Sequence, residues 1–323
     1  MVKAVLQDAF GRKIEYLRIS VTDRCNLRCT YCMPRDIELM PMSEVLTFEE
    51  IARVTKISAQ LGIRHLRLTG GEPLVRKGCE ILAAMLVKTE GIESVGLTTN
   101  GTLLPEKAGM LKAAGVTSVN VSLDTLDPEQ FLRTTGSGCL DDVLKGIESA
   151  MAAGLKVKLN TVVRDSTDVI SLVEYASVKG VPIRFIELMP IGSARNSAGK
   201  SNLDLMRVLE AAYGTPETDR KQGHGPAVYY RYPGLSQPVG FISALHGKFC
   251  AGCNRVRLTS DGYLKLCLCY SDGISLKEPL RNGCTDSELM RLISETVRRK
   301  PAAHQFEDVT QITENQPMNR IGG

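Results

Sequence analysis

The sequence has little excess charge and no long apolar run. Its formal net charge is only +4 over 323 residues, which favours a local anion-binding pocket over the broad basic surface of a nucleic-acid binder. No stretch offers the roughly 18 uncharged apolar residues of a membrane span, and the opening MVKAVLQDAFGRKIEYLR lacks the apolar core of a secretion signal. We therefore expect a cytoplasmic protein that binds neither nucleic acid nor membrane.

The overall composition is that of a globular protein. With 43% hydrophobic and 24% charged residues, the chain can bury a substantial core. It is longer than a typical domain of about 100 to 200 residues, so one large domain with an appendage is the simplest expectation. Ten cysteines in a long chain without an export signal indicate metal or redox work rather than disulfides.

Strand-like and helix-like segments alternate before Met189. The strand-like runs are YLRIS, HLRLTG, SVGLTTN, SVNVSLD, KVKLNTVV and PIRFIELMP. Helices are expected over 47–60, which opens with the Thr47/Glu50 capping box, and over 140–153, which Gly154 follows. The pattern predicts an α/β fold of about six βα units, with a parallel sheet buried on both faces. The repeats alone fit either an open doubly wound sheet or a partial barrel.

The character of the sequence changes after Met189. The Gly/Ser/Asn-rich stretch IGSARNSAGKSN indicates a link, so we place a boundary near Gly192, between a core of residues 1–192 and a C-terminal region of residues 193–323. There YYRYP and VGFISAL predict antiparallel strands. The segment VRLTSDGYLKLCL predicts a hairpin that turns tightly at Asp261-Gly262 and brings Cys253 and Cys267 together.

The first cysteine set is Cys25, Cys29 and Cys32, a C-x3-C-x2-C run directly after the first predicted strand. Three thiolates can hold three irons of a 4Fe-4S cluster and leave the fourth open to an exogenous ligand. A zinc site that lacks one ligand, or three unrelated buried thiols, are the alternatives. Strand HLRLTG then ends in Gly70-Gly71-Glu72-Pro73, where glycines allow backbone to approach a ligand closely.

The cysteine loop and the Gly-Gly-Glu-Pro segment together resemble the signature of the radical S-adenosylmethionine (SAM) superfamily. The resemblance implies an incomplete (β/α)6 TIM-type barrel with a C-terminal extension that carries a second cluster. It also implies that the open iron chelates S-adenosyl-L-methionine, which the reduced cluster cleaves to a 5′-deoxyadenosyl radical. Tyr31 would then be a SAM contact rather than a packing aromatic.

The second cysteine set is Cys250, Cys253 and Cys267, in a C-x2-C-x13-C arrangement, with Cys269 two residues later. Cys267 and Cys269 lie on one predicted strand and point to the same side, so the four thiols could also form a zinc site. The run CNRVRLTSDG resembles that of the GTP 3′,8-cyclase family, which implies a second 4Fe-4S cluster on the first three. Cys79, Cys139 and Cys284 have no ligand spacing and are expected to be small buried hydrophobes.

Arginines form the candidate anion site. Arg255 and Arg257 alternate on one strand, so both guanidinium groups project to one face and suit phosphate or carboxylate oxygens, although a solvated strand face is the alternative. Arg18 and Arg67 are charges within otherwise apolar strands and need partners. A triphosphate would serve, as would an internal carboxylate such as Asp23 or Glu72.

The resemblance to GTP 3′,8-cyclases extends from Arg18 to the terminal glycines. It implies GTP contacts at Arg18, Arg67, Thr98, Lys158, Arg255 and Arg257, and SAM contacts at Tyr31, Gly71, Ser122 and Met189. It also implies that the tail ending in Gly322 and Gly323 threads into the active site.

The same resemblance implies an activity and its partners. GTP would be converted to 3′,8-cyclo-7,8-dihydroguanosine 5′-triphosphate, an early step of molybdenum cofactor biosynthesis. The expected partners are a reducing electron donor, a second copy of the chain in a homodimer, and a downstream cyclopyranopterin monophosphate synthase. A peptide-modifying radical SAM maturase and a non-catalytic electron-transfer or zinc protein are the competing interpretations.

Overall fold

From Tyr16 to Glu187, one or two helices lie between each strand and the next. The computed structural model describes residues 5–34, 36–195, 197 and 199–322. The strands of this part are β1 (Tyr16–Ser20), β2 (His65–Thr69), β3 (Ser94–Thr99), β4 (Ser118–Ser122), β5 (Lys156–Val163) and β6 (Ile183–Glu187). The helices are α1 (Phe48–Leu61), α2 (Cys79–Val87), α3 (Leu104–Ala113), α4 (Pro128–Thr135), α5 (Leu140–Ala152) and α6 (Val169–Lys179), with the 3-10 turn η1 (Pro73–Val75). The predicted βα repetition is confirmed.

Helix α1 shows why the local sequence specifies these elements. The Thr47 hydroxyl accepts a hydrogen bond from the Glu50 N–H, and the Glu50 carboxylate accepts one from the Thr47 N–H, so two unpaired donors at the helix start are satisfied. Ile51 and Val54 lie buried on one face. Gly62 ends the helix with a φ of 121°, a value that side chains disfavour.

In the described part of the chain, one twelve-stranded sheet has the order β12-β11-β10-β1-β2-β3-β4-β5-β6-β9-β8-β7. The later strands are β7 (Glu217–Asp219), β8 (Val228–Arg231), β9 (Val239–Ile242), β10 (Arg255–Leu258), β11 (Tyr263–Lys265) and β12 (Gly273–Ser275). The expected antiparallel pairs β8–β9 and β10–β11 are present. The sequence did not reveal that β9 also pairs in parallel with β6, and β10 with β1. Because β12 and β7 remain edges, the barrel is incomplete, as predicted.

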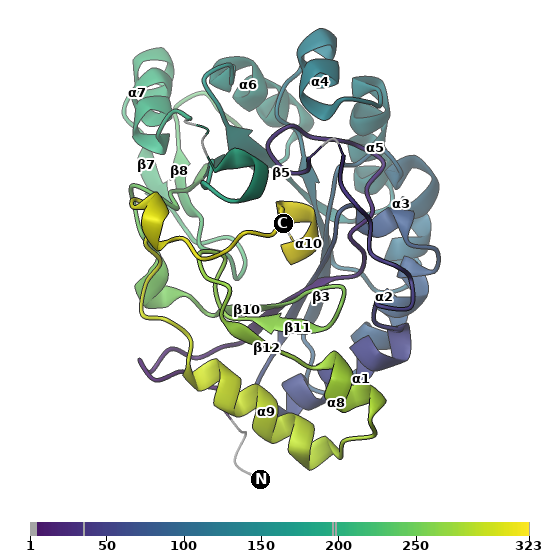
Figure 1. The fold of residues 1–323 in the computed structure, drawn as a ribbon. Helices are drawn as coiled ribbons and strands as arrows, with labels where there is room; N and C mark the ends of the chain where they lie inside the picture. Colours follow the sequence, from purple (N-terminus) through teal and green to yellow (C-terminus); the bar gives the residue numbers. More distant parts are fainter. Residues whose placement is uncertain (1–4, 35, 196, 198, 323) are drawn as a thin grey trace.

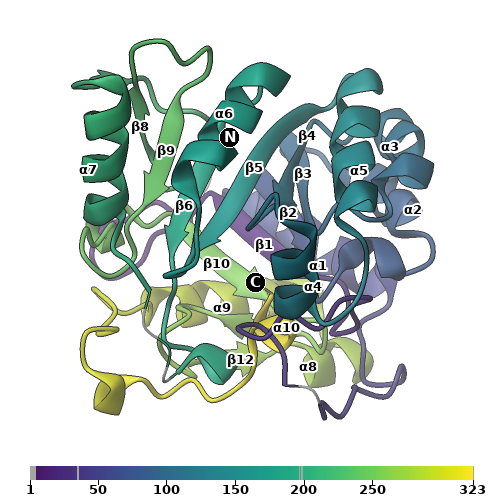
Figure 2. The same cartoon turned by 90° about the horizontal axis from the view of Figure 1, so that it is seen from above.

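Helices cover the outside of the curved sheet, whereas the C-terminal end of the chain lies within its arc (Figure 1, Figure 2). The remaining helical elements are α7 (Asn202–Tyr213), α8 (Lys277–Arg281), α9 (Asp286–Arg298) and α10 (Met318–Ile321), with the 3-10 turns η2 (Gly192–Ala194), η3 (Cys250–Gly252) and η4 (Val309–Gln311). Helix α9 packs against α1. None of the helices in the described ranges is long and apolar enough to cross a bilayer.

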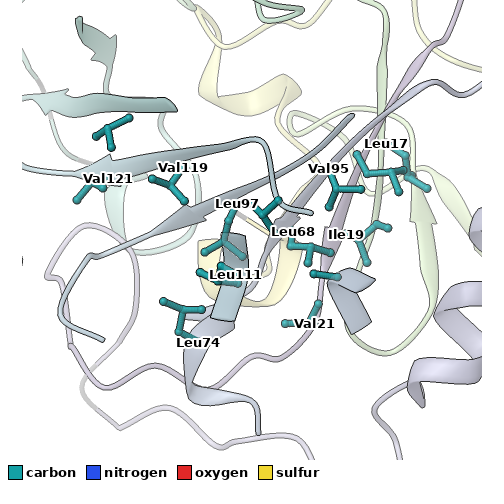
Figure 3. Packing of buried hydrophobic residues seen from close by; sticks show 14 of the residues in the cluster. Leu17, Ile19, Val21, Leu68, Leu74, Val95, Leu97, Leu111, Val119 and Val121 are labelled. Atoms are coloured by element: carbon teal, nitrogen blue, oxygen red, sulfur yellow. The ribbon is translucent and has the colours of Figure 1, made fainter. Parts of the chain in front are cut away.

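The two faces of the sheet differ in chemistry. Leu17, Ile19, Leu68 and Leu97 are buried in the hydrophobic core, which Figure 3 shows in close-up. The alternating residues, such as Arg18, point to the concave side and line a cavity. The expected burial of both faces takes two forms: the outer face packs against a hydrophobic core, whereas the inner face surrounds a polar cavity.

The turn between β10 and β11 is longer than predicted. The Gly262 N–H donates to the Thr259 carbonyl over 3.0 Å, and the Thr259 N–H donates to the Tyr263 carbonyl over 3.0 Å. Gly262 has a φ of 83°, and among the described residues only glycines have positive φ. A two-residue type I′ turn needs positive φ at both central positions. Asp261 does not adopt it, so the hairpin uses a three-residue loop that ends in a left-handed glycine.

Candidate active site

The concave face of the sheet encloses a cavity of about 830 Å³. All the residues expected to hold clusters, SAM or GTP line this one cavity: Cys25, Cys29, Cys32, Cys250, Cys253, Cys267, Tyr31, Gly71, Ser122, Met189, Arg18, Arg67, Thr98, Lys158, Arg255 and Arg257. They come from segments more than two hundred residues apart. The fold therefore brings the two cysteine sets and the cations to one space.

Strand register explains this convergence. Arg18 on β1 lies opposite Arg67 on β2 and Arg257 on β10. Farther round the sheet, Thr98 on β3 pairs with Asn120, which pairs with Lys158 on β5. Because side chains of directly paired residues project to the same face, each row presents its polar groups to the cavity.

The two cysteine sets lie at opposite ends of the cavity. Cys25, Cys29 and Cys32 follow β1, so they lie at the carboxyl ends of the parallel strands. Cys250 and Cys253 precede β10, which runs parallel to β1, so they lie at the amino ends. Cys267 follows the antiparallel strand β11 and returns to that same end. A ligand in the cavity would therefore have one set at each end.

The first cysteine loop has features suited to a thiolate-held cluster. The Leu27 N–H lies 3.4 Å from the Cys25 sulfur, and the Asn100 side-chain amide lies 3.9 Å from it. Such donors stabilise negative charge on cluster sulfurs. Without a metal, burial raises the pKa of Cys25 to about 11 and that of Cys32 to about 12. A bound metal would favour the thiolate form of these partly buried thiols.

The two glycines after β2 serve chain packing. A Cβ on Gly71 would lie 2.4 Å from the Arg24 carbonyl oxygen, and one on Gly70 would lie 2.6 Å from that of Thr22. Both oxygens belong to the segment that enters the cysteine loop. The expectation that the glycines make room for a ligand is therefore incomplete, because the first thing that they admit is the backbone of that segment.

Replacing Gly71 with alanine is expected to displace the cysteine loop. The overlap with the Arg24 carbonyl should lower the free energy of unfolding by about 2 to 3 kcal/mol and reduce the iron that the protein retains after reconstitution. Gly109→Ala on α3 is the matched control, since its added Cβ would meet no atom within 4 Å apart from its chain neighbours and the backbone of its own helix. Thermal unfolding and iron analysis measure both effects; an unchanged midpoint with full iron content would contradict this packing role.

Glu72 and Asp124 connect the cysteine loop to neighbouring strands. The Glu72 carboxylate accepts hydrogen bonds from the Thr99 hydroxyl and the Asn100 N–H, both at 2.7 Å, and burial raises its pKa to about 7. The Tyr31 hydroxyl donates to Asp124 over 2.7 Å. The Glu72 N–H donates to the Arg24 carbonyl over 2.8 Å, which joins Glu72 to the segment that enters the loop, and the Tyr31–Asp124 bond fixes the aromatic ring of the loop at the cavity wall.

Cys269 differs from its neighbours. Strand β11 ends at Lys265, so the expectation that Cys267 and Cys269 share a strand is wrong. Cys267 lines the cavity, whereas Cys269 is fully buried in an apolar cluster with Phe306 and Ile312. Within the described residues, no three Cys, His, Asp or Glu side chains are placed to share a single metal ion.

Cations dominate the middle of the cavity. Burial lowers the pKa of Arg18 to about 10 and that of Lys158 to about 8, with further lowering by neighbouring arginines. Burial and then Arg18 and Arg255 lower the pKa of Arg257 well below its usual range. Arg67 is bonded to Tyr16, the Leu97 carbonyl and Ser118, and not to Glu72. Such an accumulation of positive charge suits a polyanion.

The C-terminal segment reaches the same space. The Met318 N–H donates to the Cys32 carbonyl over 3.2 Å, and the Asn319 side-chain amide donates to the Asp23 carbonyl over 2.9 Å. The Arg257 guanidinium donates to the Gly322 carbonyl. Gly323, expected to end the threaded tail, lies outside the described residues. The tail up to Gly322 thus contacts both the first cysteine loop and the arginine row.

Sequence reasoning missed several residues of the cavity wall. Arg184 on β6 is 7% exposed and donates to Asn160 over 2.9 Å. It could have been found by the signal that identified Arg18 and Arg67, because it is a charge within an apolar strand. Tyr16 also lines the cavity, but no local pattern distinguishes it from a core aromatic.

Comparison with known proteins agrees with this arrangement. Residues 19–174 match the family model described as the radical SAM superfamily, and residues 181–306 match that described as Molybdenum Cofactor Synthesis C. Among solved structures, Streptococcus suis SuiB bound to S-adenosylmethionine has a TM-score of 0.61 at 17% identity, over 82% of this chain and 64% of that one. The anSMEcpe structure with bound AdoMet and a peptide has a TM-score of 0.57 at 18% identity, over 85% and 82% of the two chains. These two structures support the fold alone.

Several curated proteins are much more similar to this chain in sequence than these two structures are. The GTP 3′,8-cyclase of Heliobacterium modesticaldum is 46% identical over 325 residues, which cover 98% of this chain and 99% of the relative. The GTP 3′,8-cyclase of Clostridium perfringens is 40% identical over 323 residues, which cover 98% and 100%. The chain therefore belongs to the GTP 3′,8-cyclase family of radical SAM enzymes.

Proposed function

We propose that this protein converts GTP to 3′,8-cyclo-7,8-dihydroguanosine 5′-triphosphate, an early step of molybdenum cofactor biosynthesis. The observation that carries the proposal is a single cavity with cysteine sets at its two ends and a cationic row between them. A peptide maturase would need no such row, and a non-catalytic zinc or electron-transfer protein would need neither the row nor a SAM site.

Membership of the radical SAM superfamily implies a 4Fe-4S cluster and SAM. Cys25, Cys29 and Cys32 are the residues that would hold the cluster, and the cluster together with SAM would supply a radical able to take hydrogen from the substrate. The proposed SAM contacts are Tyr31, Gly71, Ser122 and Met189. Asp124 accepts the hydrogen bond of the Tyr31 hydroxyl, and this bond fixes the Tyr31 ring at the wall of the cavity.

The opposite end of the cavity is the proposed site of a second 4Fe-4S cluster. Cys250, Cys253 and Cys267 are the proposed ligands, because all three line the cavity whereas Cys269 does not. The His304 N–H lies 3.5 Å from the Cys250 sulfur. Although burial raises the pKa of Cys253, Lys300 and Arg255 lower it below its usual value, which favours a thiolate ligand. We propose that guanine is held here.

Between the two ends, the cations would hold the triphosphate of GTP. The proposed contacts are Arg18, Arg67, Thr98, Lys158, Arg255 and Arg257. In the overall change, the 3′ carbon of the ribose loses hydrogen and forms a bond to carbon 8 of guanine. The chain contributes by fixing these two carbons near each other and by excluding water, since a carbon radical reacts with whatever lies near it. The tail at Gly322 helps to enclose the site.

Membership of the family also bears on the partners and the cellular location of the protein. We propose a reducing electron donor, a homodimer, a downstream cyclopyranopterin monophosphate synthase and a cytoplasmic location. We also propose that residues 1–192 form the radical SAM core and residues 193–323 the cyclase-specific part. The sheet continues across this boundary through the β6–β9 and β1–β10 pairs, so the two parts would fold as one unit.

Anaerobic incubation of the reconstituted protein with SAM, GTP and dithionite tests the activity. We expect both 5′-deoxyadenosine and a cyclised GTP product by mass spectrometry. If 5′-deoxyadenosine forms while GTP is unchanged, the substrate is wrong but the radical SAM assignment stands. If neither forms in protein with full iron content, the catalytic proposal fails.

A further inference from the structure

Residues of three strands hold the Arg67 guanidinium on the concave face of the sheet. Its Nε donates to the Tyr16 hydroxyl on β1 over 3.0 Å, and one Nη donates to the Leu97 carbonyl on β3 over 2.9 Å. The other Nη lies 3.5 Å from the Ser118 hydroxyl on β4. A long side chain that would otherwise sample many rotamers is thereby restricted to one position.

Gly96 provides the space for this position. It lies directly opposite Arg67 in the β2–β3 register. A Cβ at residue 96 would lie 2.7 Å from both Cζ and Nη1 of Arg67 and 2.8 Å from the Ser118 hydroxyl. Gly96 has no positive φ that would require a glycine. We call Tyr16, Gly96, Leu97 and Ser118 the Arg67 cradle.

Tyr16 lies among positive groups from four strands. It is only 9% exposed and pairs in register with Arg255 on β10 and His65 on β2. The charged or titratable groups that face it are Arg18, Arg67, Arg255, His65 and the more distant Arg184. Burial raises the pKa of its phenol, but the arginines outweigh burial and lower it to about 8. At neutral pH the hydroxyl is mainly protonated and accepts the Arg67 hydrogen bond.

We propose that Tyr16 and Gly96 position Arg67 as a preorganised binding group for the triphosphate of the substrate. This inference rests on the proposed function. Binding a mobile arginine to a phosphate costs conformational entropy, whereas a cradled arginine has lost that freedom during folding. Its remaining N–H groups are then available to anionic oxygens in the cavity. Tyr16 is a positioning residue and need not touch the reacting carbons.

Tyr16→Phe removes the hydroxyl and keeps the ring. We expect the dissociation constant of inorganic tripolyphosphate, measured by calorimetry on the reconstituted protein at pH 7, to rise roughly tenfold. The KM for GTP should rise by a similar factor, while kcat at saturating GTP should change by less than about twofold. The matched control is Tyr213→Phe, whose hydroxyl bonds to Glu174 on the surface.

The pH profile separates positioning from general destabilisation. A polyanion beside Tyr16 disfavours the phenolate, so the wild-type protein should lose affinity as pH rises through about 8, where unbound Tyr16 ionises. Lys158 also titrates near pH 8, but it is present in the wild type and in Tyr16→Phe alike. Its effect therefore cancels in the ratio of the two dissociation constants. The advantage of the wild-type protein over Tyr16→Phe should therefore shrink between pH 7 and pH 9.

Gly96→Ala is the second variant and should weaken tripolyphosphate binding at least as much, with Gly109→Ala as control. Thermal midpoints and iron content establish that each variant is folded. If folded Tyr16→Phe and Gly96→Ala both bind tripolyphosphate like the wild type, the positioning proposal is overturned, even where GTP is converted. If binding weakens as expected but the wild type does not convert GTP, the cradle stands as an anion site and the proposed substrate falls.

Discussion

Replacing Cys32 with alanine is expected to abolish 5′-deoxyadenosine formation, by at least about a thousandfold relative to the wild type. The three loop cysteines share one short segment, and removing one leaves two protein thiolates to hold a cluster that needs three. Iron content after reconstitution should fall from about eight to about four atoms per chain, the amount of one cluster.

Cys139→Ala is the control for this experiment. The expectation that Cys139 is buried is wrong, because it is an exposed residue directly before α5, and it does not line the cavity. It should keep full iron and full activity. If Cys32→Ala still cleaves SAM, the first cysteine set does not hold the cluster. If Cys32→Ala and Cys139→Ala lose activity and iron equally, the substitutions damage the protein in general.

The second large effect separates Cys267 from Cys269. Cys267→Ala should keep 5′-deoxyadenosine formation, since the first cysteine set is intact at the other end of the cavity, but should reduce conversion of GTP by at least about a hundredfold. Iron content should again fall to about four atoms per chain. Liquid chromatography with mass spectrometry follows both products in one sample.

Cys269→Ala should leave the iron content unchanged and lower the free energy of unfolding by about 1 to 2 kcal/mol, because it empties a small volume next to Phe306 and Ile312. The reverse pattern, with iron lost from Cys269→Ala and kept in Cys267→Ala, would show that the buried cysteine is the ligand. Loss of iron from both would support a site with four thiolates.

Local sequence patterns specified the first six strands well. Each is a run of β-branched or large apolar residues next to a helix with readable ends, as at Thr47 and Gly62. The parallel joins of β9 and β10 were missed because pairing over long sequence separations leaves no periodic signal in either strand. The local sequence of a short strand such as β10 indicates its hairpin with β11 but not its parallel partner β1.

In the candidate site, too, local patterns were readable from the sequence, whereas contacts between distant segments were not. Cysteine spacing and family resemblance identified residues that share one cavity, including Met189, which is otherwise an ordinary apolar residue. The packing roles of two cavity glycines, of which Gly96 was not predicted, have no local sequence signal. That Gly71 admits the Arg24 backbone, and that Gly96 admits the Arg67 guanidinium, depends on contacts between separate strands and loops. The false strand at Cys269 came from extending the hairpin past Lys265.

The pairing of β1 with β10 has a consequence for synthesis of the protein. At about 5 to 20 residues per second, a ribosome needs on the order of 10 to 50 seconds to proceed from Ser20 to Leu258. During that interval one edge of β1 has no native partner, although β2 is already available on the other side. An unpaired strand edge is a template for association with other chains. Nascent chains of this protein should therefore depend on chaperones until the last third emerges.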